Sequence, residues 1–171
     1  MYNIDSKLEF EYVNGKKNNK VKEYNYYDQL IFDGEYLNGQ RWNGIVKEFN
    51  SKNELLFEGE YIKGKKWNGK GYDINGEIIY ELKNGKGKIQ EFGYKGKLLF
   101  EGELINGERN GKGKEYFENG IKLFEGEYLD GKRNGKGKEY YDIGCLLFDG
   151  EYLNGERYGN GKEFSYNELI F

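Results

Sequence analysis

Six glutamates recur along the sequence, each directly before an aromatic residue, and their carboxylates are the most regular candidates for chemistry. They are Glu23, Glu48, Glu91, Glu115, Glu139 and Glu163. Two carboxylates at close range can act as general acid and base. One glutamate per repeated segment, however, places neighbouring carboxylates about 10 Å apart, which is two strand spacings in a sheet. This spacing favours a ladder over a catalytic pair. Such a ladder either binds a basic or aromatic-rich segment or is neutralised by lysines and arginines of neighbouring segments.

The sequence Gly-Lys-Gly-Lys occurs at 111–114 and again at 135–138, and glycine-rich loops can bind phosphate. A phosphate loop enters a helix whose N–H groups converge on the anion. The chain has 27 Gly and no Ala, which argues against helices, so these glycines are predicted to lie in strands. The chain also has no His and a single cysteine, Cys145. Its carboxylates form no compact cluster suited to calcium, and we predict no metal, no cofactor and no catalytic residues.

Composition excludes further classes of function. The 171 residues include 27 basic and 30 acidic ones, giving a net charge of −3, so no basic excess is available for nucleic acid. No run approaches the roughly 18 apolar residues of a membrane span. The first ten residues lack the apolar core of a signal peptide. These features predict a cytoplasmic protein, with the inner face of a membrane as an alternative location.

A repeated motif covers nearly the whole chain. The motif Phe-Glu/Asp-Gly-Glu-Tyr, or a close variant, begins at five phenylalanines, and the last two steps are 24 residues each. A shortened unit opens at Tyr80 and a degenerate one at Leu8. The units start near residues 8, 32, 57, 80, 100, 124 and 148. They predict a single repeat domain over residues 1–171. The terminal Leu169-Ile170-Phe171 matches Leu146-Leu147-Phe148, so the natural array either ends there or continues.

Each unit contains two strand-like stretches, and each stretch is followed by a turn signal. Asn119-Gly120 is a strong signal for a two-residue hairpin turn, and we predict a four-residue turn from Asp130 to Arg133. With these turns, Gly126 faces Gly113 on one neighbouring strand and Gly137 on the other. The sequence therefore predicts an all-β fold, an elongated single-layer antiparallel sheet of tandem hairpins.

The same register assigns side chains to two faces, because successive residues of a strand point to opposite sides. Face one carries Phe124, Gly126 and Tyr128 of one strand with Gly135, Gly137 and Glu139 of the next. Face two carries glutamates flanked by lysines, which form a lattice of cross-strand charge pairs. On face one we expect aromatic rings to cover the glycines and to form an exposed, Gly-lined aromatic surface.

The only two tryptophans lie in equivalent loops, each in a unit with one inserted residue. Trp42 follows Arg41, and Trp67 follows Lys66. Tryptophan and arginine are enriched at binding hot spots, so these loops either anchor a partner or cap one end of the aromatic trough. The candidate partner-binding residues are Trp42, Trp67, Arg41, Lys66, Tyr36, Tyr61, Tyr128, Tyr152, Glu115 and Glu139.

The pattern Tyr/Phe-x-Gly-Glu-Tyr, followed by Asn-Gly-Lys-Arg-Asn-Gly-Lys-Gly, resembles the MORN repeat. The stretch Lys-Glu-Tyr-Tyr-Asp-x-Gly-x-Leu is similar to the variant MORN repeat. The resemblance extends from Leu8 to Phe171, in seven tandem units, and implies a single-layer sheet of hairpins. Asn-Gly replaces the family's usual His-Gly, a change that should not alter the fold. The family includes scaffolds at membranes and cytoskeletal structures, proteins that dimerise, and accessories to lipid kinases and methyltransferases.

The residues and the resemblance together predict a non-enzymatic scaffold or adaptor. It would bind a protein partner, or a second copy of itself, through the aromatic, Gly-lined face. One alternative is a peripheral module that binds phospholipid, favoured by the tryptophans beside basic residues. Another is an inhibitor or immunity-like protein, which would have a single specific protein partner. The chain contains no catalytic domain, so the enzymatic activities associated with the family are not expected.

Overall fold

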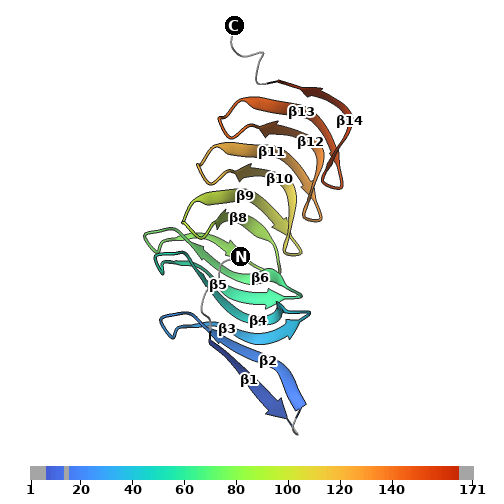
Figure 1. Cartoon of the computed structure of the whole chain (residues 1–171). Helices are drawn as coiled ribbons and strands as arrows, with labels where there is room; N and C mark the ends of the chain where they lie inside the picture. The colour runs from blue at the N-terminus through green and yellow to red at the C-terminus, as the bar shows by residue number, and fades with distance from the viewer. Residues whose placement is uncertain (1–6, 14–15, 166–171) are drawn as a thin grey trace. The chain divides into compact units, whose positions relative to one another are not determined.

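The computed structural model describes residues 7–13 and 16–165 (Figure 1). Its regular elements are fourteen β-strands in the described residues. Within each of two sheets, β1 to β7 and β8 to β14, consecutive strands pair antiparallel. No helix long and apolar enough to cross a membrane occurs in this part of the chain. The predicted all-β fold of tandem hairpins is confirmed, with the strands divided between two open seven-stranded sheets.

The two sheets belong to two compact units, Met1–Asn84 and Gly85–Phe171. The first sheet holds β1 (Lys7–Val13), β2 (Lys16–Tyr24), β3 (Leu30–Leu37), β4 (Gln40–Phe49), β5 (Leu55–Ile62), β6 (Lys65–Tyr72) and β7 (Ile78–Leu82). The second holds β8 (Gly87–Phe92), β9 (Leu98–Ile105), β10 (Glu108–Tyr116), β11 (Lys122–Leu129), β12 (Lys132–Tyr140), β13 (Leu146–Leu153) and β14 (Glu156–Glu163). A single domain over residues 1–171 stays a prediction, and Leu169–Phe171 lies outside the described residues.

The register at the strand centres of the second unit is confirmed, but the turn at Asn119-Gly120 is not the predicted one. Gly113 faces Gly126. The Phe117 N–H donates to the carbonyl of Ile121 at 2.8 Å, so three residues form the turn instead of two. Leu123 then lies opposite no residue of β10, because Tyr116 faces Lys122 and Glu115 faces Phe124. This bulge offsets the longer turn, which is why the predicted register holds.

The predicted four-residue turn from Asp130 to Arg133 is wrong for a related reason. Asp130 and Gly131 form a two-residue turn with φ of 48° and 81°, both in the left-handed region that such hairpin turns require. Leu129 therefore faces Lys132, and Arg133 already lies in β12 opposite Tyr128. The surplus residues form a bulge beyond Arg133, in which Gly135 has φ of 73°. A long turn and a short turn with a bulge use the same number of residues.

Aromatic rings pack directly on the glycines of face one, as predicted. A Cβ added at Gly137 would lie 2.5 Å from Cζ of Phe124. The Phe124 ring meets the rings of Tyr128 and Tyr152 edge-on, with centroids 5.6 and 5.2 Å away. The expectation of an exposed aromatic surface is wrong, because Phe124 is fully buried and Tyr128 and Tyr152 are only 5% and 4% exposed. Tyrosine rings and arginine side chains cover the phenylalanines.

The first unit accommodates its inserted residues as single-residue bulges at the tryptophans. In β4, Arg41 faces Tyr36 and Asn43 faces Glu35, so Trp42 has no opposite residue. Trp67 takes the same place in β6. The carbonyl of Trp42 accepts a hydrogen bond at 2.7 Å from the N–H of Gly64, in the turn of the next hairpin. The bulge thus ties one hairpin to the next.

Candidate partner-binding face

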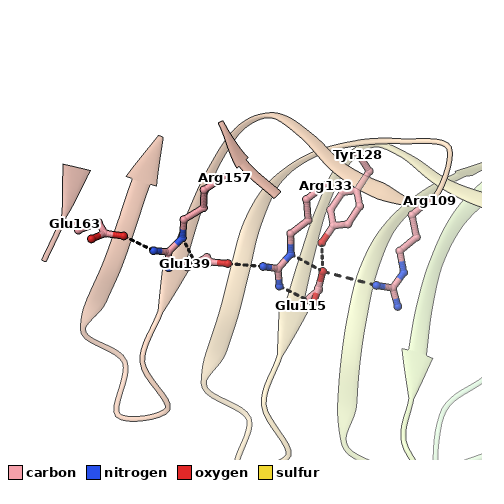
Figure 2. A network of polar contacts seen from close by, with 7 residues as sticks. All are labelled: Arg109, Glu115, Tyr128, Arg133, Glu139, Arg157 and Glu163. Carbon is pink, nitrogen blue, oxygen red and sulfur yellow. Dashed lines mark hydrogen bonds and ion pairs between the residues drawn. The ribbon is translucent and has the colours of Figure 1, made fainter. Parts of the chain in front are cut away.

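An alternating row of carboxylates and guanidinium groups crosses face one of the second unit (Figure 2). The arginines lie near the start of β10, β12 and β14, just after the two-residue turns, and the glutamates lie near the ends of the even-numbered strands. In order along the sheet, the row is Glu91, Arg109, Glu115, Arg133, Glu139, Arg157 and Glu163. We call these seven side chains the Arg–Glu row.

Arg133 shows how each arginine joins two neighbouring repeats of the second unit. Its Nη2 lies 2.9 Å from Oε2 of Glu115, and its Nη1 lies 2.6 Å from Oε1 of Glu139. Arg109 and Arg157 pair with two glutamates each in the same way. The alternative in which neighbouring basic side chains neutralise the glutamates is therefore confirmed for this row. The glutamates of the Arg–Glu row, all of them described residues, therefore do not line an unpaired acidic groove.

Each arginine also stacks on a buried phenylalanine. The central carbon of Arg109 lies 3.8 Å from the ring centroid of Phe100, and that of Arg133 lies 4.1 Å from the centroid of Phe124. A guanidinium over a ring face is attracted by the negative charge density of the ring. The carboxylates hold the guanidinium plane at its edges while the ring supports it from below. Each arginine is therefore fixed in one position.

Tyr128 completes the site at Glu115, donating its hydroxyl proton to Oε1 at 2.6 Å. Burial raises the pKa of the Glu115 carboxyl, but the hydrogen bonds from Arg133 and Tyr128 outweigh it and hold that pKa below its ordinary range. Burial and the Glu115 carboxylate raise the pKa of the Tyr128 hydroxyl well above its ordinary value. Near neutral pH Glu115 is therefore ionised and Tyr128 is neutral. Neither pKa is shifted toward neutrality, as a general acid or base would require.

The first unit repeats this arrangement in part. Arg41 lies 5.1 Å above the Phe32 ring and forms an ion pair with the buried Glu23. Lys66 lies 4.5 Å above the ring of Phe57, and its Nζ is 2.9 Å from Oε2 of Glu48. The sheet therefore accepts either lysine or arginine at this position.

The sequence model of the MORN repeat family matches residues 100–122, 124–146 and 148–168. Residues 100–168 of the chain therefore form three consecutive MORN repeats. Each matched MORN repeat supplies one arginine and one glutamate of the Arg–Glu row and the phenylalanine beneath that arginine. MORN repeats are associated with binding to proteins or membrane lipids, and they are typically non-enzymatic. No curated protein matches the sequence significantly.

The structure places the predicted binding residues in three different settings. Glu115 and Glu139 lie in the Arg–Glu row, with side chains 18% and 15% exposed. Tyr128 and Tyr152 lie buried beneath that row. The remaining candidates belong to the first unit and are half-buried there: Tyr36, Arg41, Trp42, Tyr61, Lys66 and Trp67. A partner-binding role for any of them stays a prediction.

Sequence reasoning allowed for arginines beside the glutamates but did not identify which arginines of these MORN repeats they are. The predicted four-residue turn left Arg133 outside the strand, so no face was assigned to its side chain. A signal was present, because Arg109, Arg133 and Arg157 each follow the glutamate of the preceding repeat by eighteen residues. A recurrent spacing between opposite charges would have predicted the pairing.

Face two of the MORN repeats carries the predicted lattice of lysines and acids. Lys114 lies 2.8 Å from Glu101, and Lys138 lies 3.4 Å from Asp149. The Tyr140 hydroxyl donates to Glu125 at 2.6 Å, and burial together with this carboxylate raises its pKa to about 12. Over the described residues, no group of three or more His, Cys, Asp or Glu side chains is arranged to hold a metal ion.

Proposed function

We propose that this chain is a non-enzymatic scaffold that binds a protein partner on face one of its second unit. The binding surface is the row of Arg109, Arg133 and Arg157 with the glutamates between them. The observation that supports this proposal is the fixed position of each guanidinium, which is stacked on a phenylalanine and held at its edges by two carboxylates. Arginine is among the residues that contribute most to protein interfaces.

Fixed arginines favour binding because little side-chain entropy is lost when a partner arrives. The arginine side chains are partly accessible, at 32% for Arg109, 19% for Arg133 and 34% for Arg157. A guanidinium group has five N–H donors, so donors remain beyond those that contact the glutamates. A suitable partner presents oxygen acceptors at the period of the repeats, about 10 Å or two strand spacings.

A phospholipid surface is the second candidate, supported by the half-exposed Trp42 and Trp67 at equivalent bulges of the first unit. Tryptophan suits the boundary between water and lipid. The cations beside these rings, Arg41 and Lys66, are each paired with a glutamate, which leaves less charge for anionic headgroups. We therefore favour a protein partner. Flotation with vesicles that contain anionic phospholipid tests the lipid alternative, which predicts that the wild-type protein rises with the vesicles at low salt.

The experiment for the protein partner is affinity capture from a native extract, quantified by mass spectrometry. The test variant carries Arg109→Lys, Arg133→Lys and Arg157→Lys. Lys66 shows that lysine fits this position, so the charge and the fold are retained while the planar fork of donors is removed. A matched control carries Lys112→Gln and Lys136→Gln on face two. We expect a protein captured by wild type and control to be lost with the triple variant. Equal capture by all three would exclude the arginines as the binding surface.

A further inference from the structure

The last strand of the second sheet, β14, has one neighbour among the described residues. It pairs with β13 only, and all eight of its residues are exposed. Edge strands of natural proteins usually carry prolines, charges or bulges that block further pairing. The chain has no proline. The lysine of β14, Lys162, recurs at the same register position in interior strands, as Lys114 and Lys138, so it is not specific to the edge.

The first strand, β1, is the corresponding edge of the other sheet. It pairs with β2 only, among the residues described. Leu8 and Phe10 of this strand are 46% and 39% exposed. β1 meets β2 as an ordinary odd-numbered strand does, because Leu8 faces Glu23 and Glu9 faces Lys22, as Phe32 and Asp33 do from the other side of β2. β1 therefore pairs with β2 in the same register that the interior odd-numbered strand β3 uses.

The two edges are complementary when the register of the repeats is continued. In the interior of the second sheet, Glu139 of β12 faces Phe148 of β13, and Lys138 faces Asp149. The same rule applied to β14 and a following β1 places Glu163 opposite Leu8, Lys162 opposite Glu9 and Gly161 opposite Phe10. A lysine again meets an acid. The ring of Phe10 would stand beside a glycine that is already covered by Phe148.

We propose that two copies of this chain associate head to tail, with β1 of one copy adding to the edge of β14 that no described strand of the next copy occupies. The new ladder would repeat the backbone pairing of β12 with β13. Each copy uses β1 in one contact and β14 in the other, so the contact is heterologous. It builds a ring if the rotation closes and a filament if it does not. This inference goes beyond the proposed function, because it uses the sheet edges and leaves face one available.

Zero-length carbodiimide crosslinking of the wild-type protein tests the pairing directly. The reagent joins an amine to a carboxylate only when they are in contact. In an equal mixture of unlabelled and nitrogen-15-labelled protein, we expect a Lys162–Glu9 link between labelled and unlabelled copies. Sedimentation velocity over a concentration series should show association that grows with concentration. A protein that stays monomeric throughout, or links between copies that join β14 to β14, would overturn the proposal. So would a link from Lys162 to Glu168 of the same copy, since the chain's own terminal residues would then occupy the edge.

Charge exchange gives an independent test. Lys162→Glu and Glu9→Lys each place like charges opposite one another across the contact, which should weaken association several-fold. The double variant restores an opposite-charge pair, and its association should return toward that of wild type. Lys138→Glu changes the equivalent lysine of an interior strand and should leave association unchanged. Circular dichroism checks that every variant is folded. Failure of the double variant to recover while both single variants fold would contradict the predicted register.

Discussion

The guanidinium of Arg133 lies over the ring of Phe124, with its central carbon 4.1 Å from the ring centroid. The two residues come from adjacent strands, β12 and β11, joined by the turn at Asp130–Gly131. The stack places a charged side chain directly above the fully buried core of the repeat. It therefore links packing to function, because the ring that covers the glycines also supports the surface proposed to bind a partner.

Removing this stack should destabilise the second unit. Arg133→Ala leaves Glu115 and Glu139 without their shared cation and uncovers the Phe124 ring. We expect a loss of about 1–3 kcal/mol in the free energy of unfolding, less than for a fully buried ion pair because the side chains are partly exposed. Urea denaturation followed by circular dichroism measures the change. Arg133→Lys should lose less than half as much, as the lysine at the equivalent position in the first unit suggests. Equal losses for the two variants would mean that neither the charge nor the stem stabilises the fold.

A methyl group added at Gly137 should disrupt the contact between ring and backbone. A Cβ at this position would lie 2.5 Å from Cζ of Phe124, and overpacking of this kind costs about 1–3 kcal/mol. The melting temperature of Gly137→Ala should fall accordingly. Gly120→Asn is the control, since nothing lies within 4 Å of its Cβ position and asparagine tolerates its positive φ of 84°. If the control lost as much stability as Gly137→Ala, ring packing would not be the cause.

Acid should weaken the second unit through Glu115. Burial opposes its ionisation, but the hydrogen bonds from Arg133 and Tyr128 give it a folded-state pKa below the ordinary one. A carboxylate of this kind contributes stability that is fully present above the unfolded pKa, about 4.3, and is lost as the pH falls through the folded value. The free energy of unfolding should be level near neutrality and should decline once the pH falls below about 4.3, the unfolded-state pKa. Glu115→Gln should make the decline shallower, whereas an unchanged slope would show that Glu115 is not responsible.

The centre of each strand was predictable from the sequence, but the turns were not. Gly126 and Gly137 face each other as expected, because this register pairs glycine with glycine and glutamate with lysine. The turns were wrong because bulges change how residues divide between strand and loop. The bulge at Leu123 accompanies a turn longer than predicted, and the bulge at Gly135 accompanies a shorter one. Backbone conformation at an Asp-Gly pair decides between these alternatives, and counting residues does not measure it.

The candidate site was predictable only in its acidic half. The strand alternation correctly placed Glu115 and Glu139 on face one. Arg133 was missed because its face depends on the turn that was wrongly predicted. Burial of Tyr128 and Tyr152 was missed as well, because alternation assigns a side chain to a face but does not show what covers it. Each tyrosine packs on the phenylalanine of the preceding repeat as well as on that of its own, so its burial follows only from the packing of neighbouring hairpins.

The most direct test of a protein partner on face one is chemical footprinting of the wild-type chain in a native extract. Phenylglyoxal modifies accessible arginines, and acetylation modifies accessible lysines. Mass spectrometry then compares the chain alone with the chain in complex. The account predicts that Arg109, Arg133 and Arg157 become protected in the complex, while Lys112 and Lys136 on face two react as before. Protection of the face-two lysines with unchanged arginine reactivity would contradict the account and move the binding surface to the opposite face.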